Sequence, residues 1–139
     1  FTLDTGMQRS EEGDELFYPR LMVVVAAIAG GVMPIDTPFN DFRDEEGLLK
    51  ETRLARRLGF QGKYVIHPSQ IEPVNRAFRP SPQELEQARK VVDAFESAQA
   101  QGFASTSVDG KMVDVPQATR ARRLLQIAET IQRREAAPS

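Results

Sequence analysis

Two polar side chains stand beside prolines at points where the sequence predicts that β-strands end. His67 precedes Pro68 and follows the run 63–66, which contains β-branched and aromatic residues and is expected to form a buried strand. Asp36 follows Pro34 in an earlier apolar run. Proline cannot donate a hydrogen bond to a strand ladder, and it favours extended geometry in the residue before it. Ligands bind at the carboxyl ends of parallel strands, so both side chains could line one pocket.

Composition limits what His67 can do. It is the only histidine, and the chain has no cysteine, so a zinc site built from the usual protein ligands is not expected within one copy. A lone histidine before a proline is typical of a hydrogen-bonded loop former, and a role at a ligand site is the alternative.

Asp114 also has two interpretations. It follows the turn pair Asp109-Gly110 and precedes Val115-Pro116, so its position is typical of an N-cap for the last helix. The alternative is a carboxylate that a small hairpin and a helix present to a molecule outside them.

The elements that would position these residues alternate between helix and strand. The apolar pattern predicts a helix from 15 to 29, buried over most of its circumference, and then a strand within 32–39. Asp44 is typical of an N-cap for a helix that closes at Gly59, and the next strand is 63–66. Strand, helix, strand is the order of a βα unit that feeds a parallel sheet.

The second half of the chain is predicted to be mostly helical. A short helix is expected over 71–78, and Ser81 begins a capping-box pattern for a helix that runs to about Gln101. The pair Asp109-Gly110 predicts a small hairpin, and a final helix follows Asp114.

Composition also restricts the class of protein. The chain has 139 residues, of which 40% are hydrophobic and 27% charged, as in a globular domain or part of one. A net charge of −2 gives no sign of nucleic-acid or anionic-membrane binding. The longest apolar run, 21–28, is too short to span a bilayer. We therefore expect no nucleic-acid or membrane partner and, by default, a cytoplasmic protein.

Several motifs together resemble a known family. The stretch 59–78, GFQGKYVIHPSQIEPVNRAF, is accompanied by PID at 34–36, DFRD at 41–44 and DGKMVDVP at 109–116. In this order and spacing they are similar to the citrate lyase β-subunit-like enzymes, which form the acyl-CoA lyase branch of the HpcH/HpaI aldolase superfamily. Malyl-CoA and citramalyl-CoA lyases belong to this branch, and the resemblance covers nearly the whole chain.

The resemblance implies an α/β fold. Residues 1–80 would be the C-terminal part of a TIM (β/α)8 barrel, about its last two strands. Residues 81–139 would form a mostly helical lid or oligomerisation module with a small hairpin, in a homotrimer or hexamer. The chain begins at Phe1 and would supply only part of the barrel, so we expect an N-terminally truncated form of a longer protein. Such a piece would fold poorly alone, because sheet edges and apolar faces stay uncovered.

The reaction implied by the resemblance is Mg²⁺-dependent cleavage of a 3-hydroxyacyl-CoA to acetyl-CoA and a 2-oxo acid. The Mg²⁺-binding Asp of the family would fall just before Phe1, so Asp4 is not expected as a ligand and this chain is assigned no metal residue. The alternatives are the acyl-lyase subunit of a citrate lyase complex, which acts on an acyl-carrier thioester, and a non-catalytic homologue. Short forms of the carrier-dependent kind tend to lack the lid, so the module from Ser81 to Ile131 favours the free-CoA enzymes.

The resemblance also implies site residues. Asp114 would act in the active site of the neighbouring subunit, where it moves a proton to or from an enolate carbon. Pro34, Asp36, His67 and Pro68 would lie near coenzyme A at the barrel mouth. Asp36 and His67 could equally hold the two loops together.

Two cations close to these positions also have two possible interpretations. Arg43 and Lys63 could pair with the phosphates of coenzyme A. We favour the interpretation that both are exposed and solvated.

Overall fold

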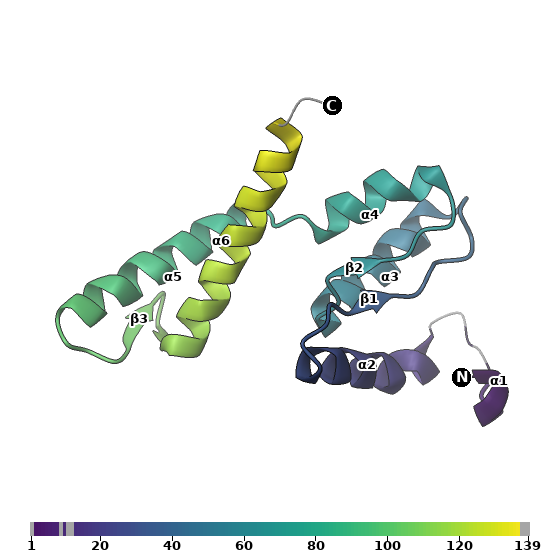
Figure 1. Ribbon diagram of the computed structural model, residues 1–139, viewed down its shortest axis with the longest axis horizontal. Helices are drawn as coiled ribbons and strands as arrows, with labels where there is room; N and C mark the ends of the chain where they lie inside the picture. The colour runs from purple at the N-terminus through teal and green to yellow at the C-terminus, as the bar shows by residue number, and fades with distance from the viewer. Residues whose placement is uncertain (1, 9, 11–12, 137–139) are drawn as a thin grey trace. The chain divides into compact units, whose positions relative to one another are not determined.

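The computed structural model describes residues 2–8, 10 and 13–136, and Figure 1 shows its elements in chain order. The chain divides into two compact units, 1–78 and 79–139. The first unit contains α1 (Thr2–Thr5), the 3₁₀ turn η1 (Asp14–Leu16), α2 (Phe17–Ala29), β1 (Ile35–Asp36), α3 (Glu45–Leu58), β2 (Gly62–Lys63), the 3₁₀ turn η2 (Pro68–Gln70) and α4 (Ile71–Phe78). The second contains α5 (Pro82–Ala100), β3 (Thr106–Val108), β4 (Lys111–Val113) and α6 (Val115–Ala136). No helix among the described residues is both long and apolar enough to cross a membrane.

The two strands of the first unit pair in parallel, as the strand–helix–strand order predicts. Ile35 lies opposite Gly62, and Asp36 lies opposite Lys63. In Figure 1 the pair runs beside α3, and α4 packs against α3 and also contacts β2. The pairing confirms the parallel βα unit.

The strands are much shorter than predicted, and the expected burial of the second is wrong. Side chains beyond β2 are exposed: Tyr64 by 64%, Val65 by 37% and Ile66 by 54%. A parallel strand is buried only when both faces are covered and each edge is paired. Within the described residues, the strand run at 63–66 has neither.

Helix α2 forms where predicted, but it is not buried over most of its circumference. Only Val24 is buried, in a small core with Ala55 and Phe60. Six large apolar residues of the helix are exposed: Phe17, Tyr18, Met22, Val23, Val25 and Ile28. The apolar pattern identified the helix correctly, but the described residues cover only one of its faces.

Helix α3 has the predicted start and end. The Asp44 carboxylate accepts a hydrogen bond of 2.9 Å from the Gly47 N–H, which satisfies one free donor of the first turn. Gly59 closes the helix in the left-handed conformation, with φ 105°. Leu48 and Ala55 are buried on its inner face.

The second unit is a helical hairpin with a β-hairpin at its turn. Ser81 and Glu84 form the predicted capping box, with each side chain bonded to the other residue's N–H. Strands β3 and β4 pair antiparallel across Asp109 and Gly110, both with positive φ, as a two-residue hairpin turn requires. The core joins both helices to β4 and consists of Phe95, Val113 and Ala118.

Candidate functional site

Asp36 is the centre of a buried ion-pair cluster at the end of β1. Arg20 on α2 holds its carboxylate with two hydrogen bonds, 3.2 Å from Nε to Oδ1 and 2.7 Å from a terminal nitrogen to Oδ2. Lys63 on β2 donates from Nζ to Oδ2 at 2.9 Å. The side chains of Asp36 and Lys63 are fully buried, so both charges depend on these partners.

Glu51 on α3 completes the cluster by pairing with the Lys63 ammonium. The four side chains carry two positive and two negative charges, and they come from α2, β1, α3 and β2. Arg20 also lies 5.9 Å above the centre of the Phe60 ring. The cluster is therefore balanced in charge and joins four elements of the first unit.

The prediction that both cations are exposed is wrong for Lys63 and correct for Arg43. Lys63 is buried rather than solvated, because two carboxylates surround its ammonium group. Arg43 is exposed and lies 5.5 Å from the Phe42 ring centre.

The described residues do not fit a magnesium ion. No group of three or more His, Asp or Glu side chains that could hold a metal occurs among residues 2–8, 10 and 13–136. Asp36, the most buried acid, already uses both oxygens for Arg20 and Lys63. A carboxylate neutralised in this way has no free charge to offer a hard cation.

Gln70 ties the segments after the two strands together, and sequence reasoning missed it. Its Oε1 accepts from the Ile66 N–H at 2.9 Å, and its Nε2 donates to the Phe39 carbonyl at 2.9 Å. The residue is 1% exposed, so its amide is bonded rather than hydrated. A glutamine inside an otherwise polar turn gives little signal, because both partners become visible only in the folded chain.

His67 is exposed and acts locally as a cap. Its Nδ1 accepts from the Ser69 N–H at 3.2 Å and lies 2.8 Å from Ser69 Oγ. Its ring stacks on Phe42, with 4.7 Å between ring centres and an interplanar angle of 22°. These contacts support the loop-former interpretation and connect the β2 exit to the segment before α3.

The structure thus brings together most of the residues predicted at the strand ends. Pro34 is buried and its carbonyl accepts from the Gln61 N–H at 2.9 Å. Pro68 is exposed and opens η2 directly after His67. Asp36 faces inward, whereas the imidazole of His67 lies at the surface.

Asp114 lies in the second unit, just before α6, and its carboxylate is unusual. Oδ1 is buried and has no hydrogen-bond partner among the described residues. The Asp114 N–H donates to Gln117 Oε1 at 3.4 Å, and its carbonyl accepts from the Ala118 N–H at 3.0 Å. Asp114 thus occupies the predicted N-cap position through its carbonyl, but no side-chain capping hydrogen bond to it occurs among the described residues. Its Oδ1 is left without the partner that buried polar atoms normally have.

Comparison with known proteins gives consistent matches. A family model described as C–C bond lyase of the TIM-barrel fold matches residues 21–131. Citrate lyase subunit beta of Leuconostoc mesenteroides subsp. cremoris is 41% identical over 128 residues, which are 92% of this chain and 42% of that protein. Mitochondrial citramalyl-CoA lyase of Mus musculus is 37% identical over 131 residues, 94% of this chain and 39% of that protein.

A solved structure is similar over almost the same extent. It is the protein CitE from Mycobacterium tuberculosis in complex with magnesium, acetoacetate and coenzyme A, with a TM-score of 0.80 and 34% identity. The match covers 93% of this chain and 49% of that one. The chain thus spans less than half the length of each of these proteins.

Proposed function

The chain belongs to the C–C bond lyase family of the TIM-barrel fold, and from this we propose that the protein is a magnesium-dependent lyase that cleaves a 3-hydroxyacyl-CoA. The products would be acetyl-CoA and a 2-oxo acid, as for malyl-CoA or citramalyl-CoA. The relative named citramalyl-CoA lyase and the CitE complex with magnesium and coenzyme A support this substrate class. The barrel itself, of which residues 1–80 would form the last part, belongs to the same proposal.

The proposed reaction is a retro-Claisen type cleavage. The hydroxyl on C3 loses its proton and becomes a carbonyl, and the bond between C2 and C3 breaks. Its electron pair forms the enolate of the acetyl thioester. A proton added at C2 then gives acetyl-CoA, so the reaction needs an acid that can reach this carbon.

The observation that carries the proposal in this chain is the unpartnered carboxylate of Asp114. A buried oxygen without a hydrogen bond is costly and is kept in few places, among them catalytic sites. We assign Asp114 the transfer of the proton to or from C2, in the active site of a neighbouring subunit. The required assembly would be a homotrimer or hexamer.

The strand-end residues have a supporting role in this proposal. Pro34, Asp36, His67 and Pro68 would lie near coenzyme A. Asp36 is enclosed by Arg20 and would act by holding the strand ends in place. The exposed ring of His67 and the adjoining Pro68 are the parts available to touch the ligand.

Magnesium would stabilise negative charge on the oxygen atoms of the substrate. Its ligands are not provided by the described residues, so every step assigned to this chain uses Asp114 and the strand-end residues alone.

The test uses the whole protein with malyl-CoA, citramalyl-CoA and related thioesters, with release of acetyl-CoA as the readout. We expect cleavage that stops when EDTA removes magnesium and returns when magnesium is added. Asp114→Asn should lower kcat by about a hundredfold or more, the scale of a lost acid–base group. Asp93→Asn is the matched control, because this exposed acid lies on α5 of the same unit. Equal activity in the two variants would contradict the role of Asp114.

A second candidate is the acyl-lyase subunit of a citrate lyase complex, which takes its thioester from an acyl carrier. It is favoured by the 41% identity to citrate lyase subunit beta. The sequence suggested that the module after Ser81 argues against this candidate. It does not, because the match to citrate lyase subunit beta covers 128 residues and cannot be contained in residues 1–80. Turnover of a citryl thioester on a carrier protein, without turnover of free CoA thioesters, would select this candidate. No turnover of either kind would select a non-catalytic homologue.

A further inference from the structure

Gln70 is the buried link between two surface turns, one after each strand of the parallel pair. Its Oε1 accepts from the Ile66 N–H at 2.9 Å, within its own turn, and this bond orients the amide. Its Nε2 donates across to the Phe39 carbonyl at 2.9 Å, 31 positions away in the chain. Because only 1% of the residue is exposed, the amide depends on these two bonds. Gln70 therefore fixes one turn against the other.

Each turn is also held by hydrogen bonds of its own. In the first turn, the Asp41 carboxylate accepts from the Arg43 N–H at 3.0 Å. In the second, the His67 carbonyl accepts from the Gln70 N–H at 3.0 Å, and the His67 ring accepts from the Ser69 N–H at 3.2 Å. The conformation of each turn is thus set locally, whereas the position of one relative to the other depends on the contacts between them.

The exposed contact between the two turns is a pair of stacked rings. Phe42 of the first turn and His67 of the second have ring centres 4.7 Å apart and an interplanar angle of 22°. A single ring pair contributes only modestly to stability. The stack therefore depends on the bond from Gln70 that holds the turns together.

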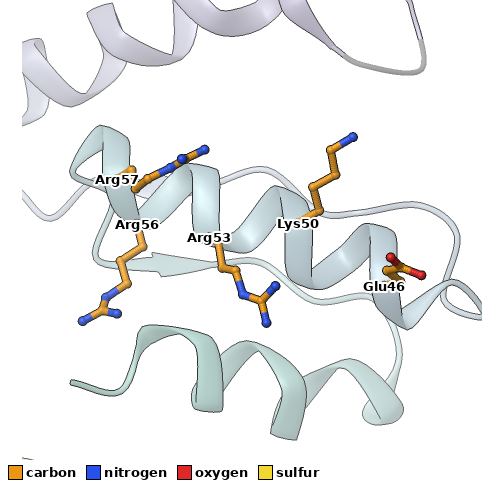
Figure 2. A pocket seen from close by; sticks show the side chains of 5 residues that line it. All are labelled: Glu46, Lys50, Arg53, Arg56 and Arg57. Carbon is orange, nitrogen blue, oxygen red and sulfur yellow. The ribbon is translucent and has the colours of Figure 1, made fainter. Parts of the chain in front are cut away.

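A pocket on α3 gives a contrast, because its charged groups do not meet. It is lined by Glu46, Lys50, Arg53, Arg56 and Arg57, all from one helix. In Figure 2 Lys50 and Arg57 extend to one side of α3, and Arg53 and Arg56 extend to the other side. These cations do not converge on one anion, whereas the Gln70 amide joins two separate segments.

We propose that Gln70 is a positioning residue that sets the affinity for the acyl-CoA substrate through Phe42 and His67. This inference rests on the proposed function, in which the exposed ring of His67 is available to coenzyme A. With the Nε2 bond in place, the ring is held on Phe42 before the ligand arrives, so binding does not have to order it. Without that bond, the ring is in place for only a fraction of the time, and the apparent Kd rises in inverse proportion to that fraction.

The test measures KM and kcat of the whole protein with the thioester that it cleaves, and the Kd of coenzyme A by isothermal titration calorimetry. Gln70→Met keeps an unbranched side chain of similar length but has no amide. We expect it to raise KM and Kd about fivefold or more, with kcat changed by less than about twofold. A purely structural defect has the opposite signature, because unfolded molecules lower the apparent kcat and leave the KM of the folded ones unchanged.

A second variant tests the stack without changing the interior. Phe42 is 44% exposed, so Phe42→Leu removes the ring at little risk to folding, and it should raise KM by a similar factor. If Gln70 acts through Phe42, the KM of the double variant should exceed that of either single variant by less than about twofold, because both changes remove the same interaction.

Thr52→Val is the matched control. It removes another buried hydrogen bond of the first unit, 2.6 Å from Thr52 Oγ1 to the Leu48 carbonyl, which lies within α3 and outside both turns. KM and Kd should stay at the wild-type values. Circular dichroism will verify that all variants keep their helices.

Three results would overturn the inference while leaving the proposed lyase reaction intact. The first is wild-type KM and Kd in Gln70→Met, and the second is an equal rise in Thr52→Val. The third is a double variant in which the two effects multiply. A wild-type protein that cleaves no thioester would contradict the proposed function instead, and the Kd of coenzyme A would still test Gln70. A wild-type protein that neither cleaves thioesters nor binds coenzyme A would overturn both.

Discussion

The carboxylate of Asp36 is held between cations from two different elements, and neither cation can be removed without leaving charge in the interior. Of the two cations, Lys63 neutralises more charge, because it pairs with Glu51 as well as with Asp36. A lysine side chain that is fully buried can stay charged only with such partners. The stability of the first unit should therefore respond strongly to this residue.

We predict that Lys63→Met lowers the free energy of unfolding by about 3 kcal/mol, the lower end for breaking a buried ion pair. The lower end is expected because Arg20 still holds Asp36 and because Glu51 is 30% exposed and can be hydrated. Urea denaturation of the whole protein, followed by circular dichroism, measures the change. Lys50→Met is the control, since Lys50 is exposed on α3. Losses of equal size in both variants would contradict the importance of the cluster.

For single residues, the sequence predicts the role correctly when the partner is near in the chain. The caps at Asp44 and Ser81 were predicted correctly because their partners lie three residues away. Lys63 was predicted wrongly because its partners Asp36 and Glu51 are 27 and 12 residues away. For the same reason Gln70, whose carbonyl partner is 31 residues away, was not found.

Helix α3 shows how one cap fixes an element. Gly47 lies in its first turn, and a Cβ there would come 2.1 Å from Asp44 Oδ2 and 2.8 Å from Phe39 Cζ. A side chain at 47 would therefore push out the cap that begins the helix. Alanine has the higher intrinsic helix propensity, so the two effects oppose each other.

We predict that Gly47→Ala destabilises the protein by about 1 kcal/mol, because the lost cap and the contact with Phe39 outweigh the gain in propensity. Thermal unfolding of the whole protein, followed by circular dichroism, gives the change. In the background of Asp44→Ala, where no cap remains, the same substitution should cost clearly less. An increase in stability from Gly47→Ala alone would show that the first turn can shift at little cost.

The sequence did not predict the lengths of the strands. The apolar runs 32–39 and 63–66 have strand-like residues, yet only two residues of each pair. A strand extends as far as a neighbour offers hydrogen bonds. The composition of the run does not tell how far that neighbour reaches. Helices hold their hydrogen bonds within one segment, which is why their bounds were predicted well.

For the whole molecule, the predicted resemblance to citrate lyase β-like enzymes is confirmed by the family model and by the named relatives. The complete barrel, the assembly and the roles of the site residues stay predictions. The two compact units, 1–78 and 79–139, divide the chain close to the predicted boundary between barrel and module. Their roles as barrel part and lid belong to the proposed function.

The apolar surface of α2 leads to a prediction for the chain in isolation. Tyr18 is 68% exposed and Ile28 61%, beside four more large apolar residues of the same helix. Exposed apolar patches of this kind mark surfaces that other parts of a protein cover. We expect residues 1–139, expressed alone, to melt without a cooperative transition and to bind the dye ANS. A sharp thermal transition without dye binding would show that this piece is sufficient for a stable fold.

The ion-pair cluster also has a consequence for the order in which the first unit forms. Its contacts join residues separated by 12, 16 and 27 positions, on four elements that must all be present. Closing such loops costs entropy before any charge finds its partner. The cluster should therefore assemble late on the folding pathway, after the transition state. Interactions made that late mainly slow unfolding and leave the folding rate nearly unchanged. The cluster then lowers the unfolding rate and so determines how long the folded unit persists.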